Sequence, residues 1–296
     1  MLNYAAIRSA ETVAALRAMV ANESDLAVRC EDRLAKHFLG LKYRIVTGIR
    51  PQPLLKRLVH LVAPGSYCFA IVRTRHFDEI LLSEIRAGVE QVVLLGAGYD
   101  SRAFRFREEL QRIRVFEIDH PGTQARKKRI LEKISKERPP GLSYISVDFN
   151  RQSFQTALAE HGFSPEKKTL FLWEGVSYYL PQSVVENVLD FVSSCAGGSS
   201  IAFDYAIKRF VDGDTSTYGG KQVAKWLKKI GEPFLFGLDA EETAVFLAKH
   251  KLCVVSDLSP EELEQSYLRT KKGLSLGRTL GHVRMAHARA AAAAWR

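Results

Sequence analysis

The chain has 296 residues, 46% of them hydrophobic, which is enough for one large buried core. Its formal net charge is +10, but no recognised nucleic-acid-binding motif accompanies the basic residues, so we do not expect a nucleic-acid partner. No apolar run approaches the roughly 18 residues of a membrane span, and no signal-peptide pattern is present. We therefore expect a cytoplasmic protein without a membrane partner.

Four cysteines stand far apart in the chain, at Cys30, Cys68, Cys195 and Cys253. None forms a Cys-x-x-Cys pair, and no Cys/His cluster has the spacing of a zinc site. We therefore expect free thiols in a reducing compartment and no bound metal.

The first 90 residues are predicted to be helical. Apolar residues recur at helical spacing within residues 12–20, 31–41 and 69–85. A break at residues 48–53 contains Gly and Pro, and a further helix begins near Leu54 and ends at Ala63-Pro64-Gly65. We interpret residues 1–90 as a helical lid or cap.

From Gln91 onward, short apolar strands alternate with amphipathic helices. Strands are predicted at residues 92–95, 112–119, 142–147, 169–173, 200–204, 252–256 and 283–288. Helices are predicted after the second strand, at residues 154–161 and 181–194, and at 239–249, where Asp239 is the expected cap. The alternation predicts an α/β domain over residues 91–296, with a doubly wound parallel sheet of seven strands. The looser pattern at about residues 206–236 is interpreted as an insertion.

The loop after the first strand reads Gly96-Ala97-Gly98. A Cβ atom at either glycine would obstruct a ligand lying against the backbone. Acidic and aromatic residues follow the next three strands, and they are Glu117, Asp119, Asp148, Phe149 and Glu174. Because the carboxyl ends of parallel strands meet at one edge of a sheet, we expect these residues to converge on one crevice.

Two nucleoside cofactors fit this arrangement, a dinucleotide and S-adenosylmethionine. An acid about 20 residues beyond the glycines suits a ribose diol in either case. The third glycine of the dinucleotide fingerprint is replaced by Ser101, which argues against NAD. S-adenosylmethionine needs a cation for its carboxylate, which Arg73 or Arg75 could supply.

Five motifs follow one another along the chain: Phe69-Ala70-x-x-Arg73, Leu95-Gly96-Ala97-Gly98-Tyr99-Asp100-Ser101-Arg102, Phe116-Glu117-Ile118-Asp119-His120-Pro121, Val147-Asp148-Phe149 and Trp173-Glu174-Gly175-Val176-Ser177-Tyr178-Tyr179-Leu180. In these motifs, and over about residues 10–288, the sequence resembles the leucine carboxyl methyltransferase family. It is most similar to the bacterial S-adenosylmethionine-dependent O-methyltransferases of that family, which include enzymes of polyketide biosynthesis. The resemblance implies a Rossmann-like class I methyltransferase fold and S-adenosyl-L-methionine as cofactor.

The resemblance also implies roles for the cofactor-binding residues. Arg73 would hold the methionine carboxylate, and Glu174 would face the amino group. Gly96, Ala97 and Gly98 would lie under the cofactor. Asp119, with Glu117 beside it, would bind the ribose hydroxyls, and Asp148 and Phe149 would hold the adenine.

The methyl acceptor is expected to be a small, acidic or phenolic metabolite. A carboxylate acceptor is already ionised at pH 7, whereas a hydroxyl acceptor would benefit from a general base. The candidate catalytic residues are Tyr205, Tyr179 and His120. Two other readings are a protein C-terminal carboxyl methyltransferase and a non-catalytic binding module on the same fold. The sequence leaves open whether the protein is a monomer or a homodimer.

Overall fold

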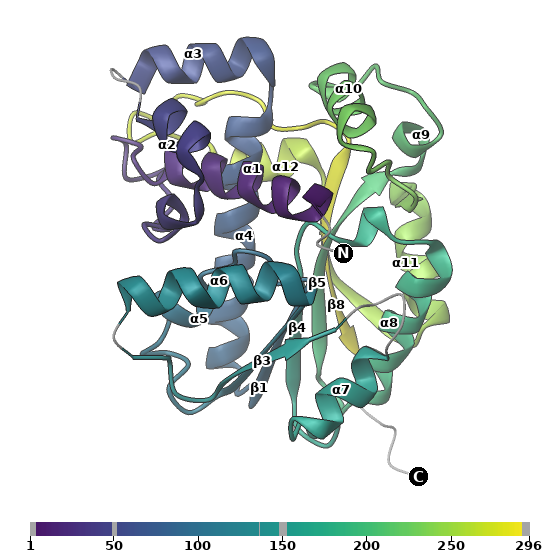
Figure 1. The fold of residues 1–296 in the computed structure, drawn as a ribbon. Coiled ribbons are helices and arrows are strands. Elements are labelled where there is room, and N and C mark those ends of the chain that lie inside the picture. Colours follow the sequence, from purple (N-terminus) through teal and green to yellow (C-terminus); the bar gives the residue numbers. More distant parts are fainter. Residues whose placement is uncertain (1–3, 49–51, 136, 148–152, 292–296) are drawn as a thin grey trace.

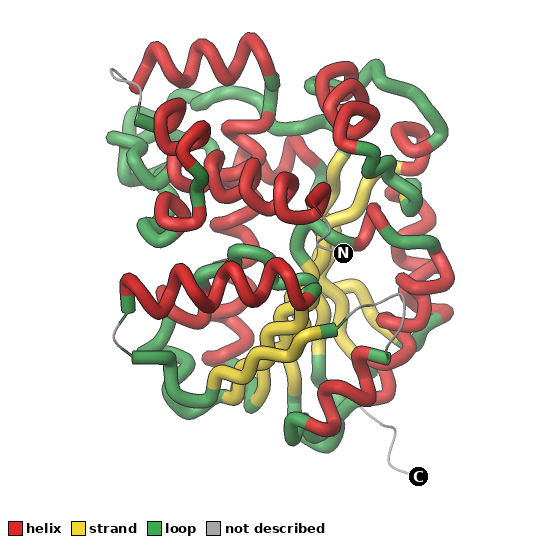
Figure 2. Tube along the Cα trace, in the orientation of Figure 1, coloured by secondary structure: helices red, strands yellow, loops and turns green. Residues whose placement is uncertain are grey.

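The computed structural model describes residues 4–48, 52–135, 137–147 and 153–291. Within these ranges, one sheet contains eight strands, in the order β3-β2-β1-β4-β5-β8-β7, with the short β6 paired to β5. The strands are β1 (Gln91–Leu95), β2 (Arg114–Asp119), β3 (Leu142–Ser146), β4 (Thr169–Trp173), β5 (Ser200–Ile207), β6 (Gly237–Leu238), β7 (Leu252–Leu258) and β8 (Val283–Ala290). Helices cover both faces of the sheet, as Figure 2 shows.

The strand order reverses between β1 and β4. From β1 the chain moves outward through β2 to β3, then crosses back to place β4 on the other side of β1, all in parallel. Such a reversal leaves a crevice at the carboxyl ends of the strands, where open α/β sheets bind ligands. The predicted parallel sheet is therefore confirmed with two differences. The short β6 adds an eighth strand, and β8 is antiparallel to both β5 and β7.

Helices connect the strands and build the layer at the upper left of Figure 1. The N-terminal helices are α1 (Tyr4–Val20), η1 (Ala35–Phe38), α2 (Leu41–Thr47), α3 (Gln52–Val62) and α4 (Ser66–Arg86). The others are α5 (Arg102–Arg105), α6 (Pro121–Ile134), α7 (Phe154–Glu160), η2 (Ser177–Tyr179), α8 (Gln182–Ser194), α9 (Lys208–Val211), α10 (Gly220–Ile230), α11 (Ala240–Lys249) and α12 (Pro260–Tyr267). Among the described residues, no single helix is long and apolar enough to cross a membrane.

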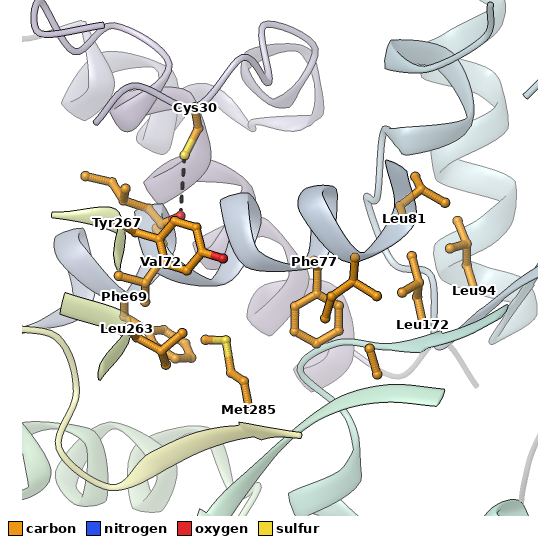
Figure 3. Close-up of a cluster of buried hydrophobic side chains, with 14 of the residues drawn as sticks. Cys30, Phe69, Val72, Phe77, Leu81, Leu94, Leu172, Leu263, Tyr267 and Met285 are labelled. Atoms are coloured by element: carbon orange, nitrogen blue, oxygen red, sulfur yellow. Dashed lines mark hydrogen bonds between the residues drawn. The ribbon is translucent and has the colours of Figure 1, made fainter. Parts of the chain in front are cut away.

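Alternate residues of each strand serve two separate cores, as the period of a strand requires. Leu94 of β1 belongs to a core shared with α4 and α12, whereas Val93 belongs to one shared with α7, α8 and α11. Figure 3 shows Phe77 and Leu81 of α4 beside Leu94 and Leu172. The long helix α4 thus fixes the N-terminal layer to the sheet.

Residues 31–41 do not form the predicted helix. They contain turns and the short η1, and α2 begins only at Leu41. Asp32 is fully buried, pairs with Arg17 of α1 at 3.3 Å, and accepts the backbone N–H of Ala35 at 3.1 Å. This carboxylate competes for backbone donors and bends the segment around α1, which apolar spacing alone does not reveal. Asp239 precedes α11 as predicted, but its side chain makes no capping hydrogen bond.

The N-terminal layer is anchored to the loop that follows β1. Arg17 donates to the carbonyl oxygen of Tyr99 at 2.7 Å. The ring of Phe38 stacks on that of Tyr99 with centroids 4.9 Å apart. Helix α1 is therefore held over the carboxyl ends of the central strands.

Candidate functional site

A cavity of about 500 Å³ lies at the carboxyl ends of β1, β2 and β4. Its inner wall contains the glycine loop after β1, the end of β2 and the segment after β4, while its outer wall is formed by α1 and residues 231–235. Two other hollows in the described part of the chain, beside α1 and beside α11, contain none of the predicted site residues. The predicted residues that line the cavity at the strand ends are Arg73, Gly96, Ala97, Gly98, Asp119, His120, Glu174 and Tyr179.

The two glycines of the loop after β1 have different physical roles. Both have positive φ, +66° at Gly96 and +48° at Gly98, a region that L side chains rarely adopt. A Cβ atom on Gly96 would lie 2.5 Å from Cγ2 of Val176, whereas one on Gly98 would meet no described atom closer than 3.8 Å. Gly96 therefore permits the approach of the β4 segment, and Gly98 leaves space at the cavity.

Asp119 is the last residue of β2 and faces the glycine loop. Its carboxylate accepts hydrogen bonds from the backbone N–H groups of Gly98 and His120. Burial raises the pKa of Asp119 and outweighs these hydrogen bonds, which lower it. Each carboxylate oxygen can accept two hydrogen bonds, so capacity remains for the hydroxyl groups of a ligand.

Arg73 of α4 reaches the far end of the cavity and is held by two acids. Its Nε lies 3.1 Å from Glu174, and its Nη1 lies 3.2 Å from Asp204 of β5. A Cβ atom at Gly175 would lie 3.0 Å from Nη1, so this glycine makes room for the guanidinium. Asp204 was not among the predicted site residues, although an acid in an apolar strand was a visible signal. Arg75 does not line the cavity and donates to the carbonyl oxygen of Ala27.

Arg102 lies behind the cavity and joins three acids. Its Nη1 lies 2.7 Å from Glu174 and 2.5 Å from Asp100, and its Nε lies 2.8 Å from Asp78. Burial would raise the pKa of Glu174, but Arg102 and Arg73 together lower it. Glu174 is therefore held as a carboxylate, and Arg102 was not among the predicted site residues.

Two predicted residues lie away from the cavity. Glu117 is buried and pairs with Lys127 of α6 at 2.6 Å, and burial raises its pKa to about 7. Tyr205 is fully buried, and its hydroxyl lies 2.9 Å from the Asp257 carboxylate and 2.8 Å from Thr243. Since Asp204 faces Arg73, the next residue of the strand must point to the opposite face. Asp148 and Phe149 lie outside the described residues.

The remaining catalytic candidates, Tyr179 and His120, both line the cavity. The ring of Tyr179 packs edge-on against Phe234 with centroids 5.1 Å apart. The Nδ1 atom of His120 accepts the backbone N–H of Gly122 at 3.2 Å, which caps α6 and leaves Nε2 as the N–H donor. Sequence reasoning missed Glu232, which lines the outer wall and comes from the segment interpreted as an insertion.

The residues of the cavity fit S-adenosylmethionine. Nη2 of Arg73 makes no hydrogen bond within the described part of the chain, so this nitrogen can donate to a carboxylate. Glu174 offers negative charge close by for an ammonium group, and Asp119 offers acceptors for a ribose diol. The volume lies within the range of about 300–1,000 Å³ that small-molecule sites occupy.

The architecture is a Rossmann-like class I methyltransferase fold, and solved structures share it. The fold is similar to that of a DUF574 family protein from Streptomyces avermitilis, with a TM-score of 0.60 and 10% identity, covering 94% of this chain and 97% of that one. A candidate methyltransferase from Thermobifida fusca has a TM-score of 0.57 and 16% identity, with 94% of each chain covered.

Sequence comparisons define the family. Residues 10–193 match the leucine carboxyl methyltransferase family. YktD of Bacillus subtilis (strain 168), named as a candidate S-adenosyl-L-methionine-dependent methyltransferase, is 30% identical over 79% of this chain and 76% of its own length. A protein of Mycolicibacterium smegmatis with a similar name is 29% identical over 75% of this chain and 73% of its own. The chain belongs to the leucine carboxyl methyltransferase family and is an S-adenosyl-L-methionine-dependent methyltransferase.

Proposed function

We propose that the protein methylates an oxygen atom, in a carboxylate or a hydroxyl, of a small natural-product-like metabolite. The observation that carries this proposal is the outer part of the cavity, which continues beyond the predicted cofactor residues. Its wall contains Ala10 and Val13 of α1, and Pro233 and Leu235 after α10. These apolar side chains suit a small organic molecule and exclude water from it.

The protein's contribution to methyl transfer is alignment. S-adenosylmethionine, when bound, supplies a methyl group that its sulfonium already activates for in-line displacement. Arg73, Asp119 and Glu174 would fix the cofactor, and the wall of α1 and residues 231–235 would orient the acceptor oxygen toward it. Such positioning accounts for a large share of the rate enhancement of a transfer reaction.

Glu232 favours a hydroxyl acceptor over a carboxylate. Of the charged side chains that line the described part of the cavity, it alone makes no ion pair or hydrogen bond, and burial raises its pKa. Arg17 and Arg73, the lining cations, are already paired with Asp32, Glu174 and Asp204. A carboxylate acceptor would meet an unpaired like charge, whereas a hydroxyl could lose its proton to Glu232.

A second candidate is methylation of a protein C-terminal carboxylate, because the matching family is described as leucine carboxyl methyltransferase. The two candidates differ in the bond that forms. The test incubates the protein with methyl-labelled S-adenosylmethionine and a panel of phenols, alcohols, carboxylic acids and C-terminal peptides. A methyl ester product releases labelled methanol in mild base, whereas a methyl ether product retains the label. Base-stable product that falls sharply in Glu232→Gln supports the hydroxyl acceptor, and base-labile product from peptides alone supports the second candidate.

A further inference from the structure

Apolar side chains are concentrated on one exposed face of the N-terminal layer. Thirteen large apolar residues of the described chain are exposed, and six of them fall within residues 41–62. They are Leu41 and Ile45 of α2 and Leu54, Leu58, Leu61 and Val62 of α3, and we call them the leucine face. Their exposure lies between 44 and 77%. Single exposed apolar residues are ordinary, but a group of this kind indicates an interaction surface.

The apolar face of helix α3 is wider than the part of it that packs against the rest of the protein. Leu55 is fully buried and Val59 packs beside it against the core shared with α4. At 3.6 residues per turn, Leu54, Leu58 and Leu61 form a stripe along α3. This stripe lies beside the buried side of the helix and faces solvent. Only part of the apolar face of α3 is therefore covered, and the rest faces solvent.

Helices α2, α3 and α10 carry positive charge alone. α2, α3 and α10 together contain eight Lys and Arg residues and no Asp or Glu. Lys42, Arg44 and Arg57 are exposed and make no ion pair within the described residues. A hydrogen bond of 3.4 Å between His60 of α3 and Tyr218 connects α3 to the start of α10, at the upper end of Figure 1.

We propose that the leucine face lies on an anionic lipid surface, with α3 parallel to the membrane plane. The leucines would enter the boundary between headgroups and acyl chains, and the surrounding cations would lie at lipid phosphates. The sequence-based expectation of no membrane partner considered only spanning segments, and a helix that lies in the interface needs none.

Charge complementarity selects this occupant over two others. A second copy related by a two-fold axis would bring the same cations together, with no acid on α2, α3 or α10 to pair with them. A nucleic acid would satisfy the cations but leave the apolar stripe of Leu54, Leu58 and Leu61 without a partner. An anionic lipid surface satisfies both parts of the face.

The test is flotation of the full chain with vesicles of phosphatidylcholine, with and without phosphatidylglycerol. We expect binding to the mixed vesicles only, weakened by salt as the cations are screened. The double variant Leu58→Gln/Leu61→Gln should lower the partition coefficient at least tenfold. The matched control is Val245→Gln, at an exposed apolar position of α11 outside this face, which should bind as the wild type does.

Because the substituted side chains are exposed, both variants should keep the wild-type melting temperature, which verifies that they fold. Absence of binding to mixed vesicles, equal binding to both kinds of vesicle, or wild-type binding by the double variant would each overturn the proposal. So would a concentration-dependent dimer in sedimentation that the double variant abolishes, because it would assign the face to a second copy. Capture of an acidic protein without any vesicle binding would assign it to a protein partner.

Discussion

Arg102 has three carboxylates within hydrogen-bonding distance and is 1% exposed. Removing the guanidinium in Arg102→Met would leave Asp78, Asp100 and Glu174 close together without their shared cation. We expect a loss of about 3–5 kcal/mol in the free energy of unfolding, the usual cost of breaking a buried ion pair. Denaturant titration measures this.

The matched control for Arg102 is Arg107→Met. Arg107 is half-exposed and lies 3.6 Å from Glu137, so its loss should change the free energy of unfolding by about 0–1 kcal/mol. An equal effect of the two substitutions would show that the buried network does not stabilise the fold.

Replacing Asp119 tests the assignment of the cofactor-binding site. Asp119→Ala removes the acceptors for the ribose diol and should weaken binding of S-adenosylhomocysteine by roughly 100-fold, because hydrogen bonds to charged groups contribute about 1.5–3 kcal/mol each. Calorimetric titration checks this, with exposed Asp190→Ala as the control. Unchanged affinity in Asp119→Ala, or tight binding of NADH by the wild type, would contradict the site assignment.

Individual site residues can be predicted from the sequence only where the residues that define their role are close in the chain. The glycine loop and the acids at strand ends can be recognised because a strand, a turn and its flanking residues lie together in the chain. Asp204 and Arg102 meet partners 131 and 72 residues away, Arg73 and Glu174 respectively, and no local pattern records such pairs. Tyr205 was predicted to lie at the cavity, but it points to the opposite face of the sheet because the preceding residue, Asp204, faces Arg73.

At the scale of elements, the turn after β1 can be tested by comparing two glycines. Gly96 and Gly88 both have positive φ, but a Cβ atom at Gly88 would meet no atom of the described residues within 4 Å. Gly88→Ala should therefore lower the free energy of unfolding only by the cost of a left-handed backbone conformation, about 1–2 kcal/mol. Gly96→Ala should cost more in the free energy of unfolding and also weaken S-adenosylhomocysteine binding, because Val176 must move. Equal costs would show that this contact is easily relieved.

Strands and long helices follow from periodicity, whereas short elements depend on tertiary contacts. The predicted bounds of β4 are exact, and those of α7 and α8 differ by one residue, because regular apolar spacing defines them. The region of η1 does not form the helix predicted for residues 31–41, because Asp32 is paired with Arg17 of α1. The pairing of β8 between β5 and β7 depends on residues too distant in sequence to be inferred from any window.

At the scale of the whole molecule, buried histidines make stability depend on pH. Burial lowers the pKa of His282 to about 3 and that of His76 to about 4. In the unfolded chain each histidine binds a proton below about pH 6.5, so unfolding takes up protons and stability falls as the pH decreases from 6.5 toward these values. His282→Gln should reduce the slope of unfolding free energy by about 1.4 kcal/mol per pH unit between about pH 4 and 6. Exposed His161→Gln is the control, and an unchanged slope in His282→Gln would show that His282 is charged in the folded protein.

Ligand binding should alter the dynamics of the two outer walls of the cavity. Ser9, Ala10, Val13 and Arg17 of α1 and residues 231–235 line it. Hydrogen exchange of their backbone amides should slow when S-adenosylhomocysteine and an acceptor are added, because both segments would lose their freedom to open. The amides of α12 lie outside the cavity lining and provide the internal reference. Exchange that is equal with and without ligands would argue against a lid.

The position of β8 has a consequence for synthesis of the protein on the ribosome. Within the described residues β7 pairs with β8 alone, and 24 residues separate the end of β7 at Leu258 from the start of β8 at Val283. Because a chain emerges at about 5–20 residues per second, β7 leaves the ribosome seconds before a partner exists for its backbone. An unpaired strand is a template for pairing with other chains. In β7 itself, Ser256 and Asp257 end the apolar run Leu252-Cys253-Val254-Val255, which limits such pairing during translation.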